Sequence, residues 1–90
     1  MNALEARPRR REGVVAQKAG DSLVLLDVDS GLYFSLDGIG DRIWSLSDGR
    51  SAAAIVDEIC AEYDADRATV ETDVLELLRE LESEGLIACE

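Results

Sequence analysis

The segment between residues 25 and 44 constrains the fold most, because it predicts a strand, a tight turn, a short second strand and a helix in direct succession. Residues 22–28 are rich in β-formers, and residues 29–31 predict a hairpin turn in which the glycine takes a positive φ. Residues 32–36 form the returning strand, after which Asp37 caps a helix instead of leading into another strand. One edge of the returning strand is therefore left without a neighbour in sequence, beside an apolar helix.

The rest of the chain predicts an α+β fold, a winged helix-turn-helix arrangement of a three-stranded antiparallel sheet followed by three helices. Residues 14–17 supply the first strand of the meander. Asp66 or Thr69 caps the third helix, and Gly85 fits its end. Residues 86–88 then leave as a short extended segment that packs back or pairs with an edge.

Charge divides the chain into a basic arm, residues 1–12, and one folded domain, residues 13–90. The arm holds four of the nine basic residues and little apolar content, which predicts a flexible tail. From residue 19 onward, 18 acidic residues face only four basic ones. An acidic surface repels phosphate, so we expect no nucleic-acid partner for the domain, whereas contact of residues 7–11 with nucleic acid stays open.

Membrane insertion and secretion are both disfavoured by the sequence. No apolar run approaches the roughly 20 residues of a membrane helix, and the charged start of the chain lacks the apolar region of a signal peptide. We therefore expect a cytoplasmic protein that has no membrane partner.

The residue types that catalysis and metal binding require are scarce. The sequence contains no His and only two cysteines, so a four-ligand zinc set cannot form. Residues 38–40 lack the third glycine and the Lys-Ser/Thr of a phosphate-binding loop, and flanking aspartates repel an anion. We expect a protein that is not an enzyme, with no catalytic residue, metal or cofactor. Cys60 is predicted to be a buried thiol, and Cys89 an exposed one that is open to adventitious dimers.

Two features each leave a structural and a binding interpretation open. Asp27 interrupts an apolar strand near its turn, where it either bonds turn amides or faces a ligand. The third helix has an apolar face wider than one stripe, which either packs wholly into the core or partly borders a groove on the strand of residues 32–36. In the second case Asp73, Glu76 and Glu80 line the rim, and peptides with a basic residue are favoured.

A series of motifs then stands in a characteristic order. It comprises Leu26-Asp27, Gly31, Tyr33-Phe34, Leu36, Gly40 and Ile43-Trp44, followed by Asp48-Gly49, Ile55-Val56, Tyr63-Asp64 and a helix from Asp73-Val74 to Gly85-Leu86. Over about residues 12–88 this combination resembles the PqqD-like family. It looks closer to the standalone lasso-peptide leader-binding branch than to the pyrroloquinoline-quinone branch.

The resemblance implies a non-catalytic winged-helix domain that recognises precursor peptides in the biosynthesis of ribosomally made, post-translationally modified peptides. The leader of the precursor adds as an antiparallel strand to the third strand and lies against the third helix. The bound precursor is presented to a maturation enzyme, either a leader peptidase or a radical-SAM protein. Carried onto this chain, the peptide-binding residues are Asp27, Val28, Leu32, Tyr33, Phe34, Ser35, Leu36, Asp73, Val74, Leu77, Leu78 and Leu81.

Two other functions stay open at this point. A winged-helix transcription regulator needs a basic recognition helix, whereas residues 68–84 contain only Arg79 against six acidic residues. A small subunit that stabilises an enzyme complex is the second alternative. The oligomeric state is open between a monomer and a strand-paired or swapped dimer, because an exposed strand edge can pair with a second copy.

Overall fold

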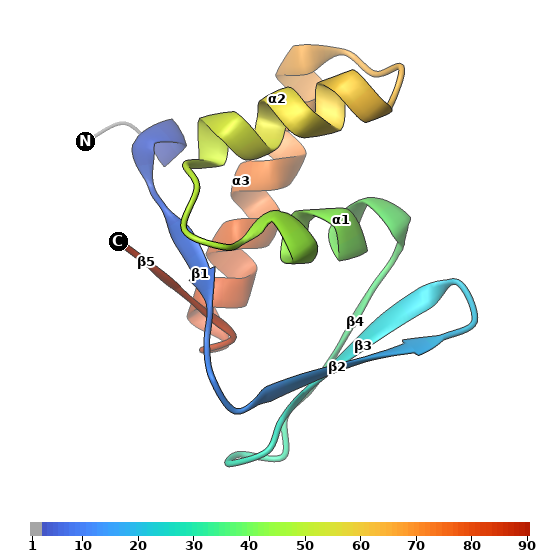
Figure 1. Cartoon of the computed structure of the whole chain (residues 1–90), viewed down its shortest axis with the longest axis vertical. Helices are drawn as coiled ribbons and strands as arrows, with labels where there is room; N and C mark the ends of the chain where they lie inside the picture. The colour runs from blue at the N-terminus through green and yellow to red at the C-terminus, as the bar shows by residue number, and fades with distance from the viewer. Residues whose placement is uncertain (1–2) are drawn as a thin grey trace.

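The computed structural model describes residues 3–90 and confirms an α+β fold in which a three-stranded antiparallel sheet precedes three helices. The elements in chain order are a 3-10 helix η1 (Ala3–Glu5), β1 (Pro8–Arg10), β2 (Val14–Ala19), β3 (Ser22–Asp27), β4 (Tyr33–Leu36), α1 (Gly38–Leu46), α2 (Ala52–Glu62), α3 (Arg67–Ser83) and β5 (Ile87–Cys89). The three helices lie on one side of the sheet β2-β3-β4, and β1 pairs with β5 apart from it (Figure 1). The winged helix-turn-helix label stays a prediction.

The antiparallel meander has β3 at its centre. This strand pairs with β2 along its whole length and with β4 from Leu23 to Leu26. Gly31 has a φ of 76° in the turn between β3 and β4, a conformation that an L side chain rarely adopts. The turn predicted at residues 29–31 is therefore confirmed.

Side chains cap the helices where the sequence placed caps. The Asp37 carboxylate accepts a hydrogen bond from the Gly40 N–H at the start of α1 (3.1 Å). Asp66 accepts from the Thr69 N–H (3.2 Å), so Asp66 is the N-cap of α3 and Thr69 lies inside the helix. Each cap satisfies a backbone donor that the helix itself leaves unpaired.

One hydrophobic core lies between the sheet and the helices. α1 packs on β3 and β4, while α2 packs on both α1 and α3. Along β4 the burial alternates, with Leu36 buried and Tyr33 exposed, as the period of a strand requires. The buried apolar side chains are Leu23, Leu25, Leu36, Ile43, Trp44, Leu46, Ala52, Ile55, Val56, Ile59, Val70, Val74, Leu78, Leu81, Leu86 and Ile87.

The N-terminal segment differs from the flexible arm that we expected over residues 1–12. Residues 1–2 lie outside the described residues, but residues 8–10 form β1 and pair with β5. Pro8 is fully buried, and the Arg10 N–H donates to the Ser47 carbonyl (3.0 Å). The sequence did not reveal this pairing, because β1 and β5 come from opposite ends of the chain and β1 consists of Pro-Arg-Arg.

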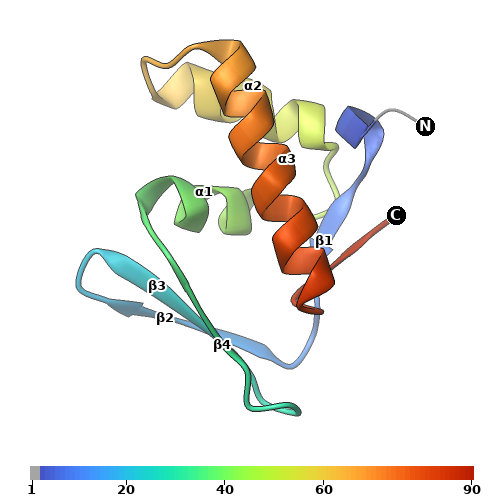
Figure 2. The same ribbon diagram turned by 180° about the vertical axis from the view of Figure 1, so that it is seen from behind.

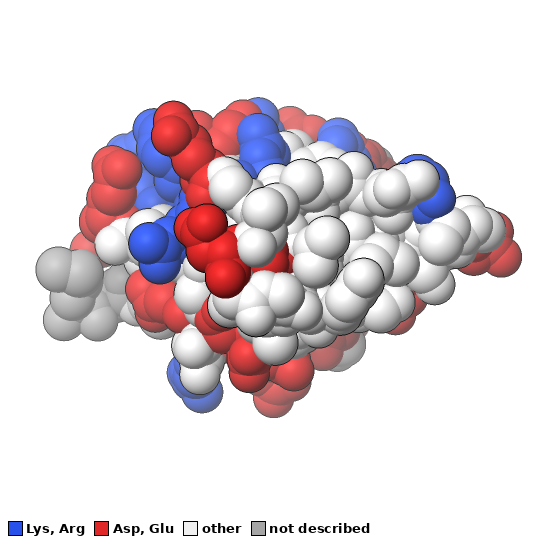
Figure 3. All heavy atoms as spheres, turned by 90° about the horizontal axis from the view of Figure 1, so that it is seen from below, with Lys and Arg blue, Asp and Glu red and all other residues white. Residues whose placement is uncertain are grey.

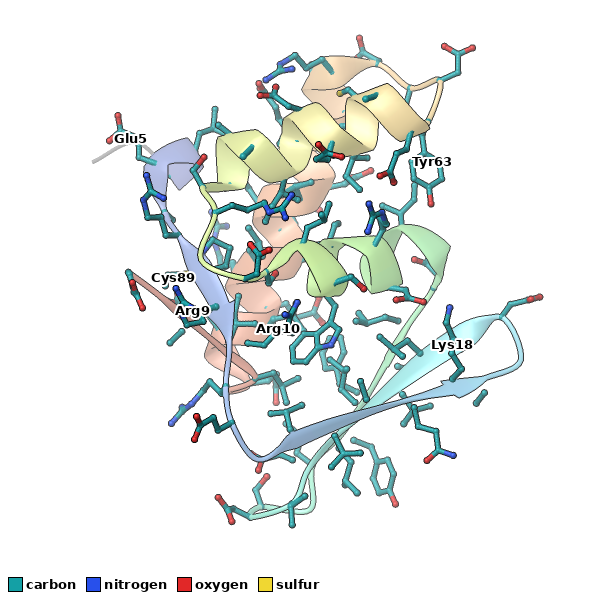
Figure 4. The ribbon with its side chains drawn as sticks, viewed as in Figure 1. Glu5, Arg9, Arg10, Lys18, Tyr63 and Cys89 are labelled. Atoms are coloured by element: carbon teal, nitrogen blue, oxygen red, sulfur yellow. The ribbon has the colours of Figure 1, made fainter. Side chains whose placement is uncertain are left out.

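Arg10 fastens this segment to the end of α1. Its guanidinium donates to the carbonyl oxygens of Trp44 (3.0 Å) and Ser45 (2.6 Å), and Figure 4 shows the side chain reaching from β1 toward that helix. A cation at a helix C-terminus is stabilised by carbonyls that lack intrahelical partners. The basic residues of this segment therefore include one with a structural role.

We predict that deletion of residues 1–11 destabilises the domain. Besides the β1–β5 ladder, six backbone hydrogen bonds link residues 6–11 to the rest of the protein. Each such bond contributes about 0.5–1.5 kcal/mol, so the free energy of unfolding should fall by at least about 2 kcal/mol in denaturant titrations followed by circular dichroism. The control Glu12→Ala trims an exposed side chain and should change it by less than about 0.5 kcal/mol. An unchanged denaturation midpoint for the truncated chain would instead support the flexible arm that the sequence predicted.

Candidate functional site

The open edge of the sheet is the outer side of β4, which pairs only with β3 among the described elements. The Asp27 N–H donates to the Leu32 carbonyl (3.0 Å), and these residues lie in register with the β3–β4 ladder. Bonded and non-bonded pairs alternate in an antiparallel ladder, so Phe34 and Leu36 bond to β3. The backbone N–H and C=O groups of Tyr33 and Ser35 therefore point away from the sheet, toward the open side.

A hollow of about 380 Å³ lies beside this edge. Its walls come from β4, from the first turns of α1 and from α3, and Figure 2 shows β4 and α3 together on the near side of the molecule. We call this hollow with its walls the groove. The lining residues are Phe34, Ser35, Leu36, Asp37, Ile39, Gly40, Ile43, Asp73, Leu77 and Glu80.

A glycine sets the close approach between two walls of the groove. A Cβ atom at Gly40 would lie 3.2 Å from both Cβ and Cδ2 of Leu36, which is tighter than ordinary van der Waals contact. The Asp37 cap fixes the direction in which α1 leaves β4. The two glycines that the sequence offered as a weak phosphate-loop fragment thus include one whose role is the packing of helix on strand.

The predicted site residues on α3 fall into two groups. Asp73 and Leu77 line the groove, whereas Val74, Leu78 and Leu81 are buried in the core. Both interpretations of the wide apolar face therefore apply, each to a different part of the helix. A role of the core group in peptide binding stays a prediction, and it could act only through support of the groove wall.

The predicted residues on the strands are also divided. Phe34, Ser35 and Leu36 line the groove. Leu32 packs partly against the core, and Tyr33 is 69% exposed on the outer face of the sheet. Val28 is exposed in the turn that follows β3.

Asp27 has the structural partner that one of its two interpretations required. Its Oδ1 accepts a hydrogen bond from the Asp29 N–H (3.1 Å), which closes the turn after β3. It is absent from the groove lining, and its contact with a ligand stays a prediction.

Five groove residues were absent from the predicted set: Asp37, Ile39, Gly40, Ile43 and Glu80. Four belong to α1 or its cap. The sequence predicted this helix as the element that follows the returning strand and assigned it no part in binding. Glu80 had been expected on the acidic rim, together with Asp73 and Glu76. The structure keeps Asp73 and Glu80 at the groove, adds Asp37 from the opposite wall, and leaves Glu76 out of the lining.

The outer face of the sheet is a second candidate surface. Val15, Val24, Leu26 and Tyr33 line a hollow of about 310 Å³ there. Figure 3, which views the molecule from below, shows a broad uncharged surface on that side with charged residues around it. This face has no helix beside it, so it lacks the wall that would select the side chains of a bound strand.

The described residues include no candidate metal site. No group of three or more Cys, Asp or Glu side chains within residues 3–90 could hold a metal ion, and none of their helices could cross a membrane. Cys89 is partly buried, which corrects the expectation that it is exposed, and Cys60 is likewise partly buried and free. Burial, assisted by a hydrogen bond with Glu82, raises the pKa of the Cys89 thiol to about 11. That thiol is therefore a poor nucleophile at neutral pH.

Comparison with known families and proteins gives consistent matches. A family model described as Coenzyme PQQ synthesis protein D (PqqD) matches residues 22–87. The PqqA binding protein of Xanthomonas axonopodis pv. citri (strain 306) is 40% identical over 86 residues, which cover 92% of this chain and 91% of that protein. The PqqA binding protein of Rhodopseudomonas palustris (strain BisB5) is 42% identical over 52 residues, which cover 57% of this chain and 51% of that protein.

Two solved structures share the fold and contain a leader peptide. "TbiB1 in Complex with the TbiA(beta) Leader Peptide" matches with a TM-score of 0.77 and 45% identity, covering 88% of this chain and 93% of that one. "Lasso peptide synthetase B1 complexed with the leader peptide" matches with a TM-score of 0.78 and 29% identity, covering 91% and 98%. The resemblance found in the sequence is thereby confirmed.

The division of α3 predicts unequal costs for two leucine truncations. Leu81→Ala opens a cavity at a fully buried position and should lower the free energy of unfolding by about 2–5 kcal/mol. Leu77→Ala trims a half-buried groove residue and should cost less than about 1.5 kcal/mol. Urea titrations of both variants provide the measurement, and equal costs would contradict the division.

Cys89 should react slowly with alkylating reagents. The Cys60→Ser variant leaves Cys89 as the one cysteine to follow. A pKa of about 11 instead of the ordinary 9.0 keeps the Cys89 thiol neutral at pH 8, with roughly a hundredfold less thiolate than a thiol of ordinary pKa. Alkylation rates measured across pH should therefore rise only well above pH 9. Glu82→Gln removes one cause of the shift but leaves the burial, so it should lower the pKa only partly. Alkylation of Cys89 as fast as that of free cysteine would contradict this prediction.

Proposed function

Because this chain belongs to the PqqD family, we propose that it is a non-catalytic adaptor that binds the leader of a ribosomally made precursor peptide by strand addition to β4. The observation that carries the proposal is the open edge of β4 beside the groove. Two findings support it: the relatives carry the name PqqA binding protein, and the two structural neighbours were solved with a leader peptide.

Strand addition uses backbone groups that are already aligned. A leader strand would pair with the outward N–H and C=O groups of Tyr33 and Ser35, and each hydrogen bond would contribute about 0.5–1.5 kcal/mol net. This backbone pairing depends little on the amino-acid sequence of the leader. Selectivity then comes from alternate leader side chains, which point into the groove toward Leu36 and Leu77.

The second edge of the sheet is a weaker candidate for the same chemistry. β2 also has one unpaired side, and Val28 N–H donates to the Gly13 carbonyl (3.1 Å) in register with the β2–β3 ladder. By the same alternation, Ala16 and Lys18 present backbone groups to that edge. The groove borders β4 and not β2, which favours β4.

The adaptor role extends to a second partner. We propose that the bound precursor is presented to a maturation enzyme, a leader peptidase or a radical-SAM protein, and that the adaptor works in the cytoplasm. Ordering of a disordered leader costs entropy, so affinity should be moderate, about −8 kcal/mol or a dissociation constant near micromolar. In the absence of peptide, the protein is either a monomer or a strand-paired or swapped dimer.

A proline placed at each edge tests which one accepts the peptide. Ser35→Pro removes an amide that points to the open side of β4 and should weaken leader binding by about tenfold or more. Ala16→Pro makes the equivalent change on β2 and should leave affinity within about twofold. Isothermal titration with the TbiA(beta) leader, and with the leader of a precursor encoded beside this gene, measures both.

Circular dichroism spectra and melting curves of both variants establish that the fold is retained. Loss of binding in Ala16→Pro alone would move the site to β2. Full binding by both variants would exclude strand addition, and no binding by the wild-type protein would exclude the adaptor role itself.

A further inference from the structure

On the basis of the proposed function, we propose that the groove takes a lysine or arginine side chain of the leader, held between the carboxylate of Asp37, the N-cap of α1, and the carboxylates of α3. The groove carries Asp73 and Glu80 on one wall and Asp37 on the other. Leader selection would then depend on one cation at a defined position of the added strand, in addition to apolar fit.

The carboxylates that line the groove have no cationic partner among the described residues. Within residues 3–90, neither Asp73 nor Glu80 forms an ion pair, and Asp37 bonds only backbone amide groups of α1. No Lys or Arg lines the groove beside these three carboxylates. Six acids elsewhere in the domain do have a Lys or Arg within ion-pair distance, namely Asp41, Asp48, Asp57, Glu62, Glu71 and Glu90.

Neither of the two basic residues of α3 lines the groove. Arg67 lies within ion-pair distance of Asp57 and Glu71. Arg79 lines a separate hollow together with Ala6 and Leu75, on the side of the helix toward the N-terminal segment. Arg10 is committed to the carbonyls at the end of α1. Since no Lys or Arg lines the groove, a cation there would come from the bound partner.

The shape of the groove suits a long cationic side chain. Its apolar lining, which includes Leu36, Ile43 and Leu77, would cover the aliphatic stem of a Lys or Arg while the charged end reaches the rim. Asp73 and Glu80 are seven residues apart on α3, or about 10 Å along the helix axis, with Leu77 between them. A cation lying over Leu77 would be within reach of both.

Strand geometry restricts where the cation can stand in the leader. The side chains of Phe34 and Leu36 point toward the groove, and Tyr33 points to the outer face. In an added strand only every second residue points the same way. The preference for a cation should therefore appear at alternate leader positions and be absent at the residues between them.

Paired peptide scans test the proposal. Each position of the TbiA(beta) leader is replaced in turn by Lys and by Glu, and both series are titrated against the wild-type protein. At one inward position, and at most at the next inward one, Lys should bind at least about tenfold tighter than Glu, since opposite charges attract and like charges repel there. Neighbouring positions should differ by less than about threefold.

Two protein variants separate local from general charge effects. Asp73→Asn/Glu80→Gln should reduce the Lys-over-Glu ratio to below about threefold. Glu58→Gln/Asp64→Asn removes two charges from exposed positions on α2 and in the loop after it, and should leave the ratio unchanged. This control matters because the whole chain carries a formal charge of −11, which attracts any basic peptide.

The outcomes distinguish this proposal from the proposed function. If the wild-type protein binds the unmodified leader but Lys and Glu peptides bind alike at every position, the cation site is refuted while leader binding stands. An equal loss of the ratio in both double variants would also refute it, because only the overall charge would then matter. Failure of the wild-type protein to bind either this series or the leader of a precursor encoded beside this gene would overturn both.

Discussion

The pairing of β4 with β3 is the interaction on which the rest of the structure depends. Its register decides which side chains of β4 face the helices and which backbone groups face outward. A slip of one residue would move Phe34 and Leu36 to the outer face and turn the bonded amides toward solvent. The turn at residues 29–31, the approach of α1 to Leu36 and the open edge therefore all follow from one ladder.

The walls of the groove are held in place by short connections along the chain and by the pairing of β1 with β5. β4 leads into α1 through the single residue Asp37, which places those two walls close together. The third wall, α3, continues through Gly85 into β5, and β5 pairs with β1. Since β1 also bonds the end of α1 through Arg10, the two helical walls are tied together through β1 and β5. A groove whose walls are fixed in this way loses little entropy when it binds a peptide.

The sequence predicted what depends on neighbouring residues. The hairpin turn, the Asp37 and Asp66 caps and the glycine after α3 were all visible, because each is a local conformational preference with a residue type that satisfies it. The pairing of β1 with β5 was not visible, because it joins two strands of only three residues each that lie near opposite ends of the chain. Membership of α3 residues in core or groove was equally hidden, since hydrophobicity alone does not tell Leu77 from Leu78.

The acidic composition acquires a more specific meaning once the ion pairs are known. A formal charge of −11 predicts attraction of basic partners by the whole surface and nothing about where they bind. In the structure, Asp37, Asp73 and Glu80 line one groove whose lining contains no Lys or Arg, and Asp73 and Glu80 form no ion pair within the described residues. Unpaired charge at the groove costs self-repulsion in the free protein, and a cationic guest relieves that cost at the place where backbone pairing is available. Electrostatics and strand addition thus favour the same side of the molecule.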